Sequence, residues 1–187
     1  MDGALRSRPA LLLIGAALVT ALLLGSAFVV VHRLRSAGGA AASTAGPPLS
    51  ESEARRQVLD PARLFVAAGR LRGVTGSYIL QPCGEGDQPP YRGVVYLNFD
   101  VPTVAETPPY FRGIARAMRA HGWVEGIAPN RHPGGKTLGR DGLSAHFHRN
   151  PDVPGRGVLQ IYGQCRYLTD HRRDATGFVN ITGELSG

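Results

Sequence analysis

The hydrophobic positions near the start of the chain form one long run. From Ala10 to Val31 the sequence has 22 residues without a formal charge, and about 20 residues of helix are needed to cross a bilayer. A cleaved signal peptide is the alternative, but its apolar core usually has about 7–15 residues and leads directly into a cleavage site. Because His32 and two arginines follow the run, we expect an uncleaved transmembrane anchor at residues 10–32.

The anchor separates a short tail at residues 1–9 from a spacer at residues 33–49 and a domain at residues 50–187. The spacer is rich in Ala, Gly and Pro, which is typical of a linker. Two arginines flank the anchor on each side, so the positive-inside count is nearly tied. A tail this short does not form an extracytoplasmic domain, and two cysteines after the spacer favour an oxidising compartment. We therefore expect a cytoplasmic tail, an extracytoplasmic domain and the membrane as one partner.

The first periodic segment of the domain predicts a helix. Ser50 and Glu53 have capping-box spacing, which predicts a helix start at Ser50. Pro61 interrupts the segment, and Asp60-Pro61 predicts a second helix start there. The apolar face that follows ends near Gly73 and consists of Leu64, Phe65, Ala68 and Leu71.

A second helix is predicted to begin at Pro108-Pro109 and to end at Gly122. Glycine is favoured at this position because it readily adopts the left-handed conformation that closes many helices. Trp123 then starts the return chain. The apolar side chains recur with helical spacing, and the predicted buried face consists of Tyr110, Phe111, Ile114, Met118 and His121.

Four segments predict strands, at residues 77–83, 92–101, 142–149 and 157–167. A glycine-rich turn, His132–Gly135, precedes the third. The second is the clearest, because apolar side chains at every other position from Val95 to Val101 alternate with Val94, Tyr96, Asn98 and Asp100. The order αββαββ predicts an α+β domain, a two-layer sandwich with both helices on one face of a four-stranded, mainly antiparallel sheet.

The net charge of +7 and the pI of about 10.1 are the composition expected of a nucleic-acid-binding protein. Four of the 21 basic residues flank the anchor, however, and the basic residues beyond it are scattered. We therefore expect no nucleic-acid partner. A mildly basic domain is compatible with an envelope rich in anionic lipids and polymers, without selecting any of them.

The two cysteines, Cys83 and Cys165, are predicted at the end of the first strand and late in the fourth. A disulfide between them would close a loop of about 80 residues, which the chain-entropy model values at roughly 4 kcal/mol. Two separate buried thiols are the alternative. We expect the disulfide, because the domain is predicted to lie outside the cytoplasm. Without CxxC spacing, neither a redox nor a zinc role is indicated.

Three patterns resemble chemical sites. Gly134-Gly135-Lys136-Thr137 lacks the first glycine and the helix of a phosphate-binding loop. Asp170-His171 with Ser144 or Thr169 lacks the nucleophile elbow of a hydrolase. His146 and His148 leave the same face of the third strand and are a weak metal candidate, since a stable site needs a third ligand, for which His171 or Asp100 are the candidates. We therefore expect no cofactor and no enzymatic activity.

The face of the sheet opposite the helices combines aromatic rings with hydrogen-bonding groups. Such a surface suits a protein or polymer partner, although antiparallel sheets often leave one polar face in water. The candidate binding residues on the second, third and fourth strands are Tyr96, Asn98, Asp100, Ser144, His146, His148, Gln160, Tyr162, Gln164 and Arg166.

Four stretches, YRGVVYLNFDVP, YFRGIARAMRAHGW, KTLGRDGLSAHFHRNPD and LQIYGQCRYLTDHR, resemble a family of uncharacterised actinobacterial, chiefly mycobacterial, envelope proteins. The resemblance covers about residues 55–187. It implies an N-terminal membrane segment or lipobox, export, and a pair of cysteines matching Cys83 and Cys165. It implies no activity, and this sequence has a membrane segment without a lipobox.

These observations together predict a membrane-tethered, extracytoplasmic interaction module of the bacterial cell envelope, which binds a protein or polymer through the open sheet face. One alternative is a metal-dependent envelope enzyme centred on His146 and His148. Another is a structural subunit of a membrane complex, with the anchor itself as the interface.

Overall fold

The domain that follows the spacer is described by a computed structural model over residues 46–84, 86–126, 130–173 and 177–185. The predicted tail, the anchor at residues 10–32 and most of the spacer lie outside these ranges. Within them, no helix is long and apolar enough to span a bilayer.

Helix α2 (Glu51–Ala68) begins at the predicted capping box. Ser50 Oγ accepts a hydrogen bond from the amide of Glu53, and the Glu53 carboxylate accepts one from the amide of Ser50 at 2.7 Å. The predicted second start at Asp60-Pro61 is wrong, because one helix runs through Pro61. Proline removes one helical hydrogen bond, but Pro61 is buried with neighbours on both sides, Val58 and Ala62. Packing against the sheet therefore maintains a single helix.

Helix α3 (Thr107–Arg119) confirms the second predicted helix, which starts one residue earlier than expected. Phe111, Ile114 and Met118 are buried as predicted. His121 is exposed instead, because the helix ends at Arg119 and His121 no longer follows its apolar face. Gly122 has a φ of 81°, the left-handed conformation expected of it.

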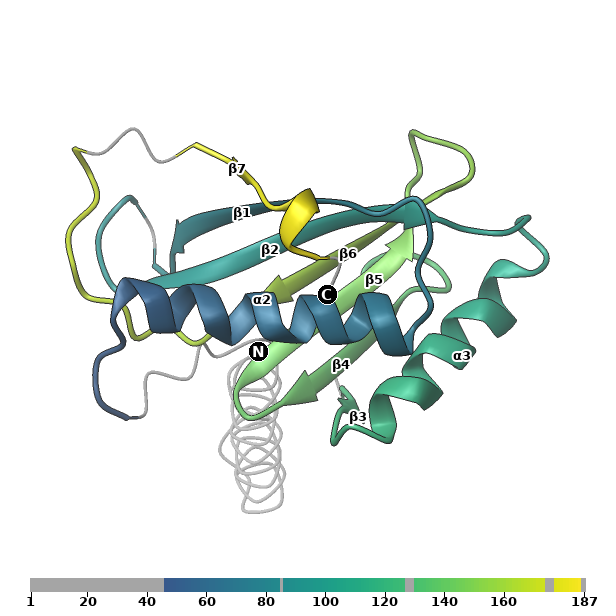
Figure 1. The fold of residues 1–187 in the computed structure, drawn as a ribbon, viewed down its shortest axis with the longest axis horizontal. Helices are drawn as coiled ribbons and strands as arrows, with labels where there is room; N and C mark the ends of the chain where they lie inside the picture. The colour runs from purple at the N-terminus through teal and green to yellow at the C-terminus, as the bar shows by residue number, and fades with distance from the viewer. Residues whose placement is uncertain (1–45, 85, 127–129, 174–176, 186–187) are drawn as a thin grey trace, which may run out of the picture. The chain divides into compact units, whose positions relative to one another are not determined.

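The sheet has seven strands among the described residues, and every neighbouring pair is antiparallel. Their order is β3-β4-β5-β6-β2-β1-β7. The strands are β1 (Thr75–Pro82), β2 (Tyr91–Asp100), β3 (Val124–Glu125), β4 (Lys136–Arg140), β5 (Leu143–Arg149), β6 (Arg156–Tyr162) and β7 (Val179–Asn180). Figure 1 shows α2 and α3 on the same side of this sheet. The predicted α+β architecture is confirmed, and the predicted count of four strands is wrong.

Three strands were missed for identifiable reasons. β3 and β7 have two residues each, too few for an alternating pattern. β4 carries a single buried apolar residue, Leu138. It pairs with β5 through Asp141 and Gly142, whose φ values of 50° and 78° fit a two-residue hairpin turn. The Asp-Gly pair was the available signal for this hairpin.

The predicted fourth strand is too long. β6 ends at Tyr162 instead of residue 167. Beyond it, the amide of Gln164 donates to Oε1 of Gln57 on α2 at 2.8 Å, so this amide leaves the ladder. The amide of Gly163 still donates to the carbonyl of Gly93 at 2.9 Å, and Tyr91 and Tyr167 form an isolated bridge.

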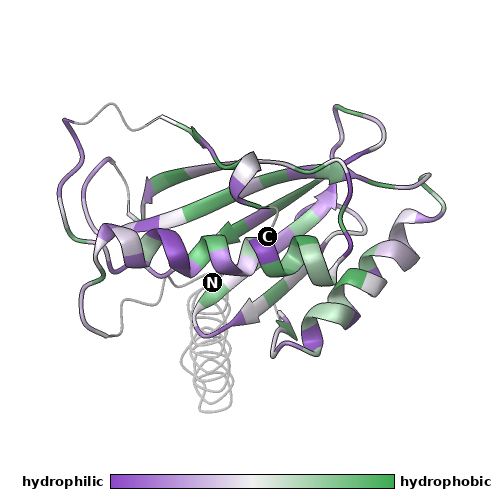
Figure 2. Ribbon diagram, viewed as in Figure 1, coloured by the Kyte–Doolittle hydropathy of each residue, from purple (hydrophilic) through white to green (hydrophobic). Residues whose placement is uncertain are grey.

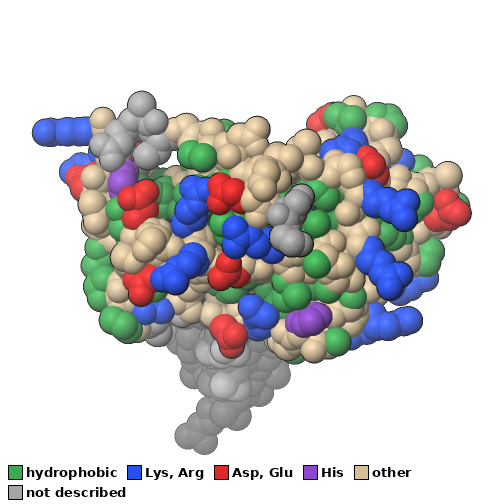
Figure 3. All heavy atoms as spheres, in the orientation of Figure 1, with side chains coloured by type: hydrophobic (Ala, Val, Ile, Leu, Met, Phe, Trp, Pro, Cys, Tyr) green, Lys and Arg blue, Asp and Glu red, His purple; other side chains and the backbone are tan. Residues whose placement is uncertain are grey.

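The core fills the space between the helices and one sheet face. Val95, Leu97 and Phe99 of β2 are fully buried, which confirms the predicted inward alternation. Figure 2 shows hydrophobic segments along the central strands and alternating hydrophobic and hydrophilic segments along both helices, as expected of amphipathic elements. The opposite side of the helices is charged: in Figure 3, acidic and basic side chains mix across the helix-bearing face.

Helix α2 packs closely against the sheet at Gly93 of β2. A Cβ added at Gly93 would lie 2.5 Å from the backbone oxygen of Ala54, and a contact that short requires the helix to move. Gly113 of α3 provides a contrast, since nothing lies within 4 Å of a Cβ added there. Glycine is therefore required at the first position and only lowers helix propensity at the second.

We expect opposite stability changes from Gly93→Ala and Gly113→Ala. Gly93→Ala overpacks the contact with α2 and should lower the free energy of unfolding by about 1–3 kcal/mol. Gly113→Ala should raise it by about 0.5–1 kcal/mol, because alanine is the better helix former. Urea denaturation of the full chain in detergent measures both values. A Gly93→Ala variant as stable as the wild type would contradict the described packing of α2.

Candidate functional site

The sheet face opposite the helices, here called the outer face, carries a row of polar side chains across five strands. The strand register places Ser77 of β1, Tyr96 of β2, Gln160 of β6, His146 of β5 and Thr137 of β4 opposite one another in this order. All five are partly exposed. We call them the polar row. With about 4.8 Å between strands, the row presents hydroxyl, amide and imidazole groups over about 19 Å.

Tyr162 lies beside the polar row and connects several of its neighbours. The guanidinium of Arg92 lies over its ring, 4.5 Å from the centroid, and His146 meets the ring edge-on at 5.6 Å between centroids. Its hydroxyl donates to Oε1 of Gln160 at 2.8 Å. Burial raises the pKa of Tyr162, with a smaller contribution from Tyr96. The hydroxyl therefore stays protonated at neutral pH and keeps its role as a donor.

His148 is on the outer face as predicted, but it is buried. Its exposed fraction is 6%, because the ring of His132 stacks on it at 3.6 Å between centroids and an angle of 8°. Burial, followed by the charges of His132 and His146, lowers the pKa of His148 to about 4. Asn130 holds this loop: its side-chain amide donates to the carbonyl of Lys136 at 2.9 Å, and its oxygen accepts from the amide of His132.

The predicted metal ligands do not converge. His146 Nδ1 lies 3.3 Å from Thr137 Oγ1, whereas His148 is stacked on His132. Of the two possible further ligands, Asp100 forms an ion pair with Arg156, and His171 Nε2 lies 2.7 Å from the hydroxyl of Tyr167. No group of three or more His, Cys, Asp or Glu residues in the described ranges could hold a metal ion.

Two residues of the considered hydrolytic triad, Asp170 and Ser144, lie in different parts of the fold. Asp170 forms an ion pair with Arg172 at 2.6 Å. Hydrogen bonds from the Arg172 side chain hold the pKa of Asp170 at about 2. Ser144 is on β5, where it pairs with Gly139 and Tyr162. The Asp170 carboxylate is thus engaged by a neighbouring arginine.

The structure places the ten predicted face residues in three settings. Tyr96, Ser144, His146, Gln160 and Tyr162 are partly exposed on the outer face, together with exposed Asn98 and Asp100. His148 is on this face but covered. Gln164 and Arg166 lie beyond the end of β6, where Gln164 Nε2 donates to the carbonyl of Asp141 and Arg166 donates to the carbonyl of Pro47.

The outer face also contains residues that were not predicted. Arg92 precedes Val94 and Tyr96 in the same alternation, so the strand pattern was sufficient to include it. Ser77 and Thr137 depend on strand pairing and could not be assigned from the sequence. Phe178 reaches Tyr96 with 5.5 Å between ring centroids. Val94, predicted among the outward residues, is fully buried, so its side chain is not accessible on this face.

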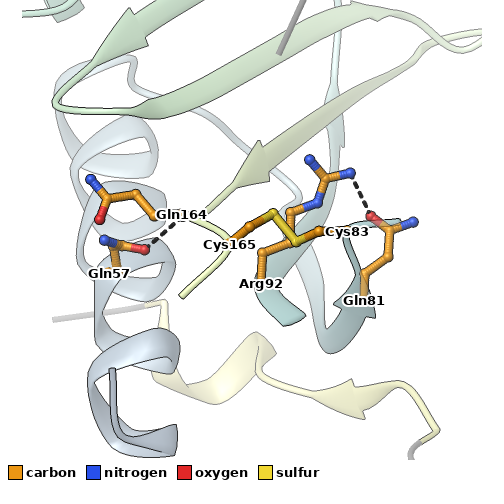
Figure 4. Close-up of a disulfide and its surroundings, with 6 residues drawn as sticks. All are labelled: Gln57, Gln81, Cys83, Arg92, Gln164 and Cys165. Carbon is orange, nitrogen blue, oxygen red and sulfur yellow. Dashed lines mark hydrogen bonds between the residues drawn. A yellow bond between two sulfur atoms is a disulfide. The ribbon is translucent and has the colours of Figure 1, made fainter. Parts of the chain in front are cut away.

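Cys83 and Cys165 form the predicted disulfide, with 6.0 Å between their Cα atoms. The bond joins the chain after β1 to the segment after β6, and Figure 4 shows it beside Arg92, Gln81 and Gln164. It closes a loop with a sequence separation of 82 residues. A cross-link over this length stabilises the fold chiefly by restricting the unfolded chain.

A separate hollow of about 350 Å³ lies among the loops at one end of the sheet. Arg149 belongs to its lining but is already engaged, since it donates to the carbonyl of Pro102 at 2.8 Å and to Thr107 Oγ1 at 2.9 Å. The hollow is lined by Val104, His132, Pro133, Arg149, Asn150, Pro151 and Pro154. Arg149 is therefore the one Lys, Arg, Asp or Glu in this lining, and its guanidinium is already bound to Thr107 at the start of α3.

Comparison with known proteins places this chain in a family. A family profile described as "Putative lipoprotein LppJ" matches residues 50–184. The chain belongs to the LppJ family. Relatives with the same description from Mycobacterium tuberculosis and Mycobacterium bovis are 34% identical over 171 residues, which covers 91% of this chain and 89% of each relative. No solved structure matches the chain. Membership confirms the resemblance to mycobacterial envelope proteins.

We expect the stability of this LppJ-family protein to fall as the pH is lowered from about 6.5 to 4.5. The pKa of His148 is about 4 in the folded state and about 6.5 in an unfolded chain. In this window the unfolded state binds more protons, so the free energy of unfolding decreases by roughly 2 kcal/mol.

His148→Leu is the matched variant, because it keeps a buried side chain and removes the titrating group. Urea denaturation at pH 7 and 4.5 should show a smaller loss of stability in His148→Leu than in the wild type. Equal losses in the two proteins would refute the assignment of this pH dependence to His148.

Proposed function

We propose that this chain is a membrane-tethered interaction module of the cell envelope and that its domain binds a partner through the outer face. The observation that carries the proposal is the polar row beside Tyr162, on a face that neither α2 nor α3 covers. Aromatic and hydrogen-bonding side chains that converge on an exposed surface are typical of recognition sites. The domain acts in this proposal by binding, not by catalysis.

The proposed location is supported by the relatives and by the cysteines. The relatives are named as lipoproteins, and lipoproteins of bacteria carry their lipid on a cysteine. In this chain both cysteines, Cys83 and Cys165, are joined in the disulfide. The apolar run at residues 10–32 is therefore the proposed attachment to the membrane. A disulfide is typical of an oxidising compartment, which supports an extracytoplasmic domain and a cytoplasmic tail.

The geometry of the outer face supports binding in preference to metal chemistry. The rings of His146 and His148 have separate partners, Thr137 and His132. Burial, with a smaller effect of Arg92, also lowers the pKa of His146. A neutral imidazole at neutral pH can donate one hydrogen bond and accept another. As a member of the polar row, His146 is therefore suited to bind hydroxyl groups of a partner.

Alanine at Tyr96, His146 and Tyr162 should weaken binding of the full chain to a mycobacterial cell-wall preparation by at least about tenfold, since truncated aromatic hot spots often cost more than 1 kcal/mol. Co-sedimentation of the detergent-solubilised protein with the wall fraction measures the affinity. Arg112→Ala with Arg116→Ala is the control, because both arginines are exposed on α3, on the covered side of the sheet.

Circular dichroism must first show that the triple variant is folded. If it is not, the single variant Tyr96→Ala replaces it, since Tyr96 is partly exposed and contacts Phe178 at the surface. Wild-type affinity in a folded outer-face variant would refute the proposed function.

A further inference from the structure

Arg92 is a half-buried cation at the edge of the polar row. One terminal nitrogen donates to Oε1 of Gln81 at 3.0 Å, and the guanidinium lies over the ring of Tyr162. Its Nε is buried and has no hydrogen-bond partner in the described ranges. No carboxylate of those ranges forms an ion pair with it. A charge removed from water is usually paired, and Arg92 has no counter-ion among the residues that the structure describes.

Other arginines of the domain show how such a charge is normally satisfied. Arg55 also lies over a tyrosine, with 5.1 Å from its guanidinium carbon to the Tyr78 ring centroid, but it pairs with Glu184 at 2.5 Å. Arg156 pairs with Asp100. Arg55 and Arg92 thus share the same stacking arrangement, and only Arg55 has an acidic partner.

The surroundings of Arg92 favour an anion. Burial is the largest influence on the pKa of Arg92 and lowers it. The electrostatic effects of Tyr162 and Tyr96 act in the opposite direction. The outer-face acid Asp100 is engaged by Arg156 on the neighbouring strand. The disulfide stands next to Arg92 in Figure 4, and the guanidinium turns toward Gln81. This fixed position presents a positive charge beside uncharged donors.

The rest of the face indicates the kind of molecule that carries the anion. The polar row offers hydroxyl, amide and imidazole groups, which match the hydroxyl groups of a sugar, and Tyr96 and Phe178 add aromatic surface. A peptide that adds a strand binds at a sheet edge. The polar and aromatic groups of the polar row lie instead across the central strands β2, β6 and β5. Their position on the face favours a polysaccharide that lies across the strands.

We propose that the outer face binds an acidic polysaccharide and that Arg92 receives one of its carboxylate or phosphate groups. The inference rests on the proposed function and names the chemistry of the partner. Because Nε is buried, the terminal N–H groups of the guanidinium donate the charge-assisted hydrogen bond to the anion. The polar row binds the hydroxyl groups of the polysaccharide where it continues across the strands.

The test uses three polymers with one backbone: neutral dextran, carboxymethyl dextran and dextran phosphate. The full chain in detergent should bind the two acidic polymers more tightly than dextran, and comparison of the two distinguishes carboxylate from phosphate as the preferred group. Arg92→Gln should lower the affinity for the acidic polymer about 10- to 100-fold, the range expected for a hydrogen bond between charged groups. Arg55→Gln, which changes the net charge equally and lies on the covered side, should stay within about twofold of the wild type.

A second measurement does not depend on the folding of a variant. In the wild-type protein, the NMR signal of the Arg92 Nε–H should shift on addition of the acidic polymer, and that of Arg55 should not. Unchanged Arg92 signals, equal binding of neutral and acidic dextran, or tighter binding of poly-glutamate than of carboxymethyl dextran would overturn the inference. If outer-face alanines abolish wall binding while Arg92→Gln has no effect, the proposed function stands and this inference fails.

Discussion

The packing of two helices onto a single face of the sheet determines the rest of this structure. Phe65 of α2 meets Trp123 edge-on at 5.2 Å between ring centroids and Phe147 of β5 at 6.2 Å, and Phe111 of α3 meets Phe147 at 5.4 Å. These aromatic contacts link both helices to the inner side of the sheet and exclude water there. The strands must therefore alternate between a buried side chain and one that points to the outer face. The polar row is the consequence of this alternation.

The elements with long periodic patterns were predictable from the sequence. The capping box at Ser50 located the start of α2, and the alternation around Leu97 located β2 and its inward side. Pairs of residues that meet only through strand register were not predictable. Thr137 lies next to His146 because β4 pairs with β5, and the prediction did not include β4. His132 lies on His148 because Asn130 fixes a loop, which leaves no periodic signal in the sequence.

The outward positions of the candidate face follow from strand alternation, and strand pairing adds further residues to them. Most of the predicted residues are on β2, β5 and β6, whereas Gln164 and Arg166 lie beyond the end of β6, where the amide of Gln164 donates to Gln57 of α2. Arg92 was within reach of the strand pattern, but its lack of an acidic partner is a property of the folded structure. Membership of the LppJ family supports the envelope setting, and the disulfide agrees with it.

The central claim is that the outer face of an envelope-exposed domain binds a wall polymer. A photo-crosslinking amino acid placed at position 98, exposed on the outer face, or at position 112, exposed on α3, tests this claim in intact cells. The account predicts cross-links to cell-wall polysaccharide from the site of Asn98 and none from the site of Arg112. Equal cross-linking from both positions, or cross-links from the site of Arg112 alone, would contradict it.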